Sequence, residues 1–182
     1  GELSPRLEGR IDLQKYNEAA QTLQNMLVFP QGGTTRRPGT KVAGRSKDGG
    51  KVRLVNFEFS DEQAYVLEFG ANYIRFFKDG GILTETVKNI TAITKANPAV
   101  VTSNSHGFSN GDRVFISSVV GMTEVNNLEF TVAGATTNTF QLSGVNSSAY
   151  TTYSSGGTAG KIVEVTTTYS VTDIFEINHA QS

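Results

Sequence analysis

The N-terminal part of the chain contains one stretch of helical periodicity. Its apolar positions, Leu13, Tyr16, Ala20, Leu23 and Leu27, recur at steps of three and four residues, which is typical of one stripe on an amphipathic helix. The pattern predicts a helix over about 13–26 in an N-terminal arm. One amphipathic helix cannot bury its own stripe, so we expect the arm to dock on a sheet or on another subunit.

A corner rich in proline, glycine and arginine follows this pattern. The short apolar run 27–29 ends at Pro30, and Gly32-Gly33 allows a reversal that residues with a Cβ would resist. Pro38-Gly39 predicts a second turn. Thr34, Thr35, Arg36 and Arg37 lie between the two turns, and the polar segment 42–50 is predicted to be a loop.

Alternating apolar positions after residue 50 predict an antiparallel β-meander of about four strands. The candidate strands are 51–60, 64–69, 73–78 and 82–87. Apolar residues of both parities occur in 51–60, which predicts burial on both faces or a β-bulge. Gly70-Ala71-Asn72 and Asp79-Gly80-Gly81 are predicted turns.

The composition changes at Asn89, where Thr, Ser, Asn, Gly and Val begin to dominate. Turn signals recur about every ten residues, a spacing that indicates a small antiparallel barrel or sandwich. The candidate strands are Ile90–Lys95, Ala99–Ser103, Arg113–Ser117, Glu129–Ala133, Thr139–Leu142 and Thr158–Val163. Residues 163–165 and 174–177 return to the phenylalanine- and acid-containing pattern of the meander and predict strands. A tight or helical turn is predicted over 170–173 between them.

These patterns predict a mainly β protein in three parts. Residues 1–50 form the arm, with the helix about 13–26 and the Pro/Gly/Arg corner. Residues 51–88 and 162–182 form a discontinuous β scaffold, and residues 89–161 form an inserted small antiparallel β-barrel. The chain starts at Gly1 and stops in strand-like sequence, so we expect it to be a fragment of a longer protein.

Charge and composition narrow the classes of function. The chain has 182 residues, a net charge of −1 and no cysteine, which excludes disulfides and thiolate chemistry and gives no global attraction to polyanions. Residues 1–50 hold eight Lys/Arg and five Asp/Glu, whereas residues 162–182 hold three acids and no base. This asymmetry predicts local protein partners. No apolar run approaches the roughly 18 residues of a membrane span.

His106 is the first candidate for catalysis, because Ser105 and Asp112 lie close to it in the sequence. The alternative, which we favour, is a turn histidine whose ring packs locally. Two histidines and no cysteine argue against a transition-metal site.

Four carboxylates form a second candidate, because paired carboxylates can act as general acid and base. They are Glu58, Asp61, Glu62 and Glu68. Asp61-Glu62 lies in a predicted turn, where solvated acids are ordinary. The glycine pairs match neither GxGxxG nor the GxxxxGK phosphate loop. We therefore predict no enzyme activity and no cofactor.

Arg36-Arg37 is the most distinctive local charge. Two adjacent arginines can bind phosphate or an acidic protein surface, or can remain solvated. Beside the rigid Pro38-Gly39 turn, we favour a subunit contact over nucleic-acid binding. The predicted contact residues are Leu23, Leu27, Phe29, Arg36, Arg37 and Pro38.

Two stretches resemble known families. Residues 1–88, with Asn25-Met26 and the GG…RRPG corner at 32–39, together with 163–182, resemble the N-terminal part of tail nozzle (tail tubular protein B-like, DNA-stabilisation) virion proteins of short-tailed bacteriophages. In that family a helical arm and this corner precede a β-propeller-like body. Residues 99–161, with His106-Gly107-Phe108 and Asn110-Gly111-Asp112, resemble the small β-barrel named after the first catalytic-cysteine half-domain of ubiquitin-activating enzyme. Because this chain lacks cysteine, that resemblance implies the barrel alone.

The resemblance implies a structural component of a phage tail tube or nozzle. Such a subunit is made in the bacterial cytoplasm and binds neighbouring subunits and portal or adaptor proteins in the virion. It would form a homo-oligomeric ring, with a hexamer as our estimate, around DNA in transit during ejection. One alternative is a binding module whose barrel loops, 119–127 and 145–155, contact host glycan or another tail protein. A wall- or glycan-degrading virion enzyme is a third possibility, and it would need a convergent acid and base.

Overall fold

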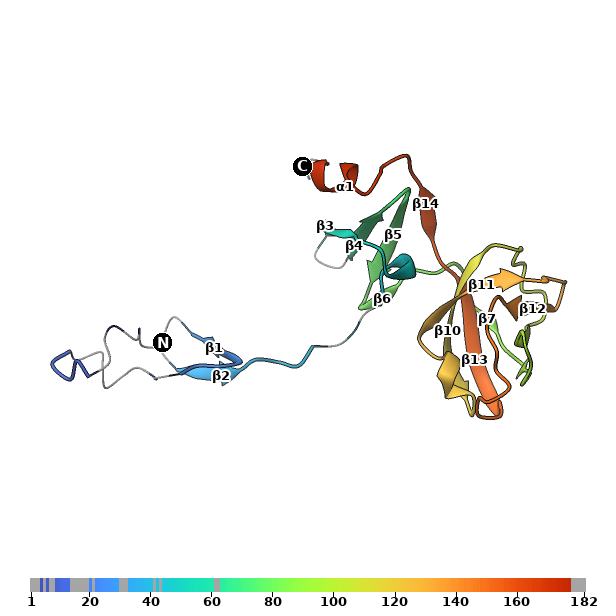
Figure 1. Ribbon diagram of the computed structural model, residues 1–182, viewed down its shortest axis with the longest axis horizontal. Coiled ribbons are helices and arrows are strands. Elements are labelled where there is room, and N and C mark those ends of the chain that lie inside the picture. The colour runs from blue at the N-terminus through green and yellow to red at the C-terminus, as the bar shows by residue number, and fades with distance from the viewer. Residues whose placement is uncertain are drawn as a thin grey trace. The chain divides into compact units, whose positions relative to one another are not determined.

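The computed structural model describes residues 4, 6, 9–13, 20, 22–29, 33–40, 42, 44–60 and 63–177 (Figure 1). Contacts divide the chain into two units, Gly1–Val42 and Ala43–Ser182. Each unit is described by itself below.

The N-terminal unit contains a two-stranded antiparallel hairpin. Strands β1 (Met26–Val28) and β2 (Thr34–Arg36) pair with Leu27 opposite Thr35, and the amide of Phe29 donates to the carbonyl of Gly33 at 3.2 Å. Every residue of both strands is exposed. This β1–β2 hairpin therefore has no core of its own.

The predicted helix over 13–26 is wrong at its C-terminal end. Residues 22–24 have no regular structure, and Met26 belongs to β1. The physical reason is at Asn25, whose φ of 55° lies in the left-handed region and ends any right-handed helix there. Residues 14–19 and 21, which make up most of the predicted helix, lie outside the described residues.

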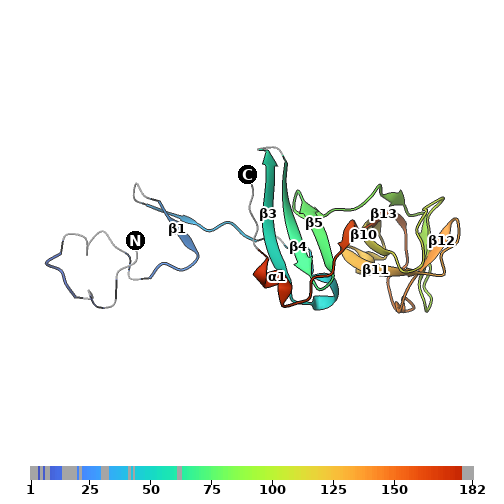
Figure 2. The same cartoon turned by 90° about the horizontal axis from the view of Figure 1, so that it is seen from above.

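The second unit contains a scaffold sheet with the strand order β14-β5-β4-β3, and β6 pairs with β5. Figure 2 shows β3, β4 and β5 side by side. Its strands are β3 (Arg53–Ser60), β4 (Gln63–Gly70), β5 (Tyr73–Lys78), β6 (Gly81–Ile82) and β14 (Glu164–Thr166). The predicted strands 51–60, 64–69 and 73–78 are confirmed, and a register shift between Glu58 and Ser60 is the predicted irregularity.

The fourth strand of the predicted meander is wrong beyond Ile82. The chain leaves the scaffold sheet there and pairs with the segment that returns to it. The amide of Val163 donates to the carbonyl of Leu83 at 3.0 Å, and Thr84 and Ile162 form an isolated bridge. We call this paired crossing, residues 83–87 with 161–163, the neck.

The neck leads to a seven-stranded antiparallel sheet with the order β7-β13-β10-β11-β12-β9-β8. We call residues 88–161 the module. Its strands are β7 (Lys88–Asn89), β8 (Ala92–Ile93), β9 (Val100–Thr102), β10 (Arg113–Val120), β11 (Leu128–Ala133), β12 (Thr139–Leu142) and β13 (Ser155–Lys161). A 3-10 helix, η4 (Thr123–Val125), follows β10.

The module is not the closed barrel that the sequence predicted. Its edge strands, β7 and β8, pair with β13 and β9 and not with each other. Only Ile90 and Thr91 separate them in the chain, so the sheet curls until its two edges lie a few residues apart. The predicted strand Ile90–Lys95 is shorter in the structure, where only Ala92–Ile93 (β8) is strand and β7 lies just before the predicted range.

The module has its own apolar core. In β10, Val114 and Ile116 are buried at alternate positions. The alternation shifts by one at Ser118, whose φ is 61°, so that Val119 is the next buried residue. The module's most deeply buried large side chains come from four strands, from the loop before η4 and from η4 itself, and they are Val101, Val114, Ile116, Met122, Val125, Val132, Phe140 and Leu142.

The last predicted strand, 174–177, is wrong, because the segment forms the helix α1 (Asp173–Glu176). Ser170 and Asp173 hold its first turn, since each side chain accepts a hydrogen bond from the other's backbone amide, at 2.8 and 3.3 Å. Ile174 is buried, and the guanidinium of Arg53 donates to the carbonyls of Ile174 and Ile177 at 3.2 and 2.6 Å.

Two searches of the described residues bear on ligands and membranes. They contain no group of three or more His, Cys, Asp or Glu arranged to hold a metal ion. They also contain no helix that is both long and apolar enough to span a bilayer.

Gly157 in β13 provides a test of the module's packing. Its φ is +94°, and an added Cβ would lie 2.5 Å from a methyl group of buried Val119. Gly111 has the same φ and open space around it, so it is a matched control. Both alanine variants lose about 1–2 kcal/mol to backbone conformation. We expect Gly157→Ala to lower the free energy of unfolding further, by about 1–3 kcal/mol from overpacking, as measured by urea denaturation. Equal losses at both sites would contradict this packing.

Candidate functional site

The candidate site starts from a row of residues across the scaffold sheet. Glu68 in β4 lies opposite Arg75 in β5, and Arg75 lies opposite Glu164 in β14. Directly opposed residues of neighbouring strands point to the same face. The register therefore places one arginine between two carboxylates. Arg75 is fully buried, and Glu68 is 2% exposed.

Arg75 binds carboxylates from two different sheets. Its Nε donates to Glu164 at 2.8 Å within the scaffold sheet. Its Nη1 donates to both oxygens of Glu129, at 2.9 and 3.1 Å, and Glu129 lies in β11 of the module. One buried guanidinium thus connects the scaffold sheet to the module.

A short 3-10 helix, η3 (Lys47–Gly49), adds further charges to this face. The ammonium of Lys47 pairs with Glu164 and also lies 4.8 Å from the centroid of the Tyr73 ring. Asp48 forms an ion pair with Arg113 of β10 at 3.1 Å. The segment predicted to be a polar loop therefore supplies an ordered part of the site.

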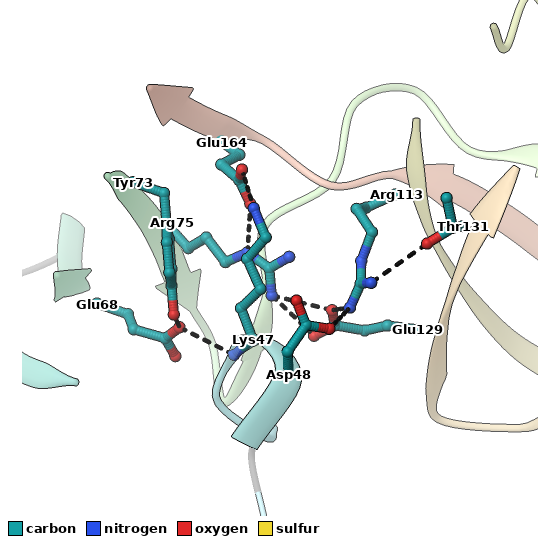
Figure 3. A network of polar contacts seen from close by, with 9 residues as sticks. All are labelled: Lys47, Asp48, Glu68, Tyr73, Arg75, Arg113, Glu129, Thr131 and Glu164. Atoms are coloured by element: carbon teal, nitrogen blue, oxygen red, sulfur yellow. Dashed lines mark hydrogen bonds and ion pairs between the residues drawn. The ribbon is translucent and has the colours of Figure 1, made fainter. Parts of the chain in front are cut away.

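Arg113 completes the connection on the module side. It pairs with Glu129 at 3.2 Å and donates to the hydroxyl of Thr131 at 3.2 Å. Figure 3 shows the resulting ion-pair network between the scaffold sheet, η3 and the module. Its members are Lys47, Asp48, Glu68, Tyr73, Arg75, Arg113, Glu129, Thr131 and Glu164.

Tyr73 occupies the edge of the network beside Glu68. Its hydroxyl donates to Glu68 at 2.8 Å, and its ring lies 5.4 Å from the Cζ atom of Arg75. Burial raises the pKa of the Tyr73 phenol, and the bond to Glu68 raises it further. The phenol therefore acts as a neutral donor. Gly70 allows this placement, because a Cβ there would lie 2.1 Å from the Tyr73 ring.

The charges of the network stabilise one another's ionised forms. Burial by itself would raise the pKa of Glu164, but the hydrogen bonds from Lys47 and Arg75 outweigh it and lower that pKa below its ordinary value. Burial opposes the charge on Arg75 as well, but the hydrogen bonds that it donates to Glu164 and Glu129, with the negative charges of these carboxylates, nevertheless raise its pKa. A general acid needs a carboxyl with a raised pKa. Glu164 has the opposite property, which suits a structural ion pair.

The network is satisfied in most of its polar atoms. Nη2 of Arg75 and Nε of Arg113 are buried without a hydrogen-bond partner among the described residues. Each such atom carries a desolvation cost, and the ion pairs of the network must offset that cost.

The predicted contact residues lie elsewhere, in the N-terminal unit. The β1–β2 hairpin carries four of them: Phe29 at its turn end, Leu27 in the middle of β1, and Arg36 and Arg37 at the open end, where the amide of Arg37 donates to the carbonyl of Asn25 at 2.9 Å. These four residues are exposed, as is Pro38 beyond β2, whereas Leu23 before β1 is half-buried.

Among the described residues, His106 is hydrogen-bonded to neither Ser105 nor Asp112. His106 is buried, accepts the amide of Phe108 through Nδ1 at 2.9 Å, and packs its ring against Phe108 and Phe140. This confirms the locally packed turn histidine. Glu68 belongs to the ion-pair network, and Asp61-Glu62 lies outside the described residues.

Sequence reasoning missed Arg75, Glu129 and Glu164. One signal was present, namely an arginine on the same parity as Tyr73 in an aromatic-rich strand. A charge on a buried face requires a partner. Its partners are 54 and 89 residues away, in segments whose pairing the local pattern could not supply.

Comparison with known proteins found a similarity for one part of the second unit. Residues 96–162 match the family described as the ubiquitin-activating enzyme E1 FCCH domain. The match agrees with the resemblance found for the inserted segment. No curated protein matches the chain.

Arg75 provides the first test of the network. We expect Arg75→Met to lower the free energy of unfolding by about 3–5 kcal/mol, because it leaves Glu129 and Glu164 without their buried cation. Adding Glu129→Gln and Glu164→Gln to the same chain should recover part of this loss. Lys78→Met, in the same strand but half-buried, should cost less than about 1 kcal/mol. A triple variant no more stable than Arg75→Met would contradict the ion-pair account.

The lowered pKa of Glu164 provides a second test, through pH. Its ionised form stabilises the fold above the ordinary glutamate pKa of about 4.3, and this contribution disappears as the pH falls through the lower folded pKa. We expect Glu164→Gln to be less stable than the wild type at pH 7, with the difference shrinking as the pH falls below the ordinary glutamate pKa and through the lower folded pKa. Exposed Glu176→Gln is the control. A difference that stays constant with pH would contradict the prediction.

Proposed function

We propose that this protein is a non-catalytic structural subunit of a phage tail tube or nozzle. It would be made in the bacterial cytoplasm and assembled into the virion as a homo-oligomeric ring, with a hexamer as the working number. Its partners would be neighbouring subunits and the portal or adaptor, and DNA would pass through the lumen during ejection. The resemblance of residues 1–88 and 163–182 to tail nozzle proteins supports this proposal.

The observation that carries the proposal is the β1–β2 hairpin. Met26 and Val28 lie on one face of it and Leu27 and Phe29 on the other, and all four side chains are 41–49% exposed. A two-stranded hairpin is marginally stable alone in water. One with apolar residues on both faces favours an arm that becomes ordered against another subunit.

The ion-pair network supports the same proposal from the second unit. A subunit of a tube must transmit force between its parts without changing shape. A fully buried arginine that binds carboxylates of two sheets resists their separation, because separation would leave charges unpaired in a low-dielectric site.

A binding module remains the second candidate. Glu124 of η4 accepts from both the amide and the hydroxyl of Thr151, at 2.7 and 2.9 Å, so the two loops named from the sequence are tied together. This gives one pre-formed polar surface, which would suit glycan or another tail protein.

The arm is tested by changing its apolar residues. We expect the wild-type chain to form a ring of about six copies, and Leu23→Asp with Leu27→Asp to reduce it to smaller species while the module keeps its melting temperature. Size-exclusion chromatography with light scattering measures the first property and circular dichroism the second. Exposed Val120→Asp in the module is the control and should leave the ring intact.

The outcomes separate the candidates. A double variant that assembles like the wild type would contradict the arm. A wild-type chain that stays monomeric at every concentration and binds glycan would favour the binding module.

A further inference from the structure

We propose that the β1–β2 hairpin of one copy docks on an apolar, acid-lined patch at the C-terminal end of the scaffold in a second copy. This inference rests on the proposed function, and it names the surface that receives the arm. The second unit carries this patch between β14 and the end of α1.

The patch consists of four large side chains from one segment. They are Val165, Tyr169, Val171 and Phe175, with exposed fractions of 49, 41, 42 and 56%. We call them the C-terminal patch. Isolated exposed apolar residues are normal, but these lie over one face of the scaffold sheet. The register aligns Val165 with Ile74, Phe69 and Arg53 in one row across the sheet. Arg53 binds the backbone of α1, so the segment from Val165 to Phe175 crosses that face from β14 to β3.

The segment that carries the patch is held in place. Val165 pairs with Ile74 of β5, and the backbone at Asn72 exchanges hydrogen bonds with Thr167 and Tyr169, at 2.9 and 2.8 Å. The buried side chain of Ile174 and the bonds from Arg53 to its carbonyl fix α1. A pre-formed surface loses little entropy when a partner binds, which favours docking here.

The arm is the complementary surface. The hairpin presents four exposed apolar side chains, Met26, Leu27, Val28 and Phe29, and Arg36 lies directly opposite Met26. Arg37 follows and is also exposed. The arm thus combines a similar number of apolar groups with two positive charges.

Charge makes the match specific. The segment 162–177 holds three acids, Glu164, Asp173 and Glu176, and no lysine or arginine. Glu164 is committed to the ion-pair network, whereas Asp173 and Glu176 on α1 are exposed beside Phe175. Opposite charges around an apolar centre set orientation and exclude wrong partners. The two arginines of the arm would face these two acids.

A second copy is the occupant that accounts for both surfaces together. Every chain has one arm and one patch, so each copy can give an arm to one neighbour and receive an arm from another. Contacts of this head-to-tail kind close into rings when the rotation between copies allows it. A single type of contact would then cover both exposed apolar surfaces of every subunit in the ring.

Charge reversal tests the pairing in the full chain. Arg36→Glu with Arg37→Glu, and separately Glu176→Arg, should each raise the dissociation constant of the assembly about tenfold or more. Asp173 is left unchanged because it holds the first turn of α1. Combining the three changes in one chain should return the constant to within about threefold of the wild type. Arg45→Glu, exposed and outside the hairpin, is the control.

Mixing distinguishes docking between copies from docking within one chain. When the arm variant and the patch variant are mixed, each can supply the surface that matches the other, so light scattering should show recovered assembly. If the variants alter the hydrodynamic size of the monomer but their mixture does not assemble, the proposal would be overturned in favour of an arm that binds its own chain. If the wild type forms a ring and none of the charge variants weakens its assembly, the docking proposal would be overturned but the structural role would stand. A wild-type monomer would overturn both.

Discussion

The structure of the second unit depends on a single buried cation. Arg75 lies at the centre of the scaffold sheet, and its guanidinium has carboxylate partners on both sides of the boundary between scaffold and module. Moving a charge of this size out of water costs several kcal/mol, and the ion pairs must offset that cost. The placement of Glu129 and Glu164 is therefore a condition for burying Arg75 at all. The two sheets meet where this condition is satisfied.

The same constraint explains how a long segment can interrupt a sheet. The chain leaves the scaffold after β6 and returns as β14, and the paired backbone of the neck brings the two crossings together. The returning strand, β14, places Glu164 directly opposite Arg75 of β5. The module contributes Glu129 from its own sheet. The module is therefore attached to the scaffold both by the backbone pairing of the neck and by the ion pairs of Arg75 with Glu129 and Glu164.

Local patterns predicted the strands well where side chains alternate or are aromatic, as at Tyr73–Lys78 and Thr139–Leu142. They failed where a tertiary or backbone constraint decided the structure. Leu27 continued a helical period, but the left-handed conformation of Asn25 and the pairing with Thr35 made it part of a hairpin. The ion-pair network could not be predicted, because its partners come from strands that are adjacent only after the module has folded. The local packing of His106, in contrast, followed from the sequence.

The curled sheet of the module has a consequence for its use as an insert. Its two edge strands have only two residues each, and they are consecutive in the chain. Long open edges invite pairing with other chains, and very short ones offer almost no template for it. A β unit of this kind can be added to a protein that exists at high local concentration without introducing a new route to aggregation.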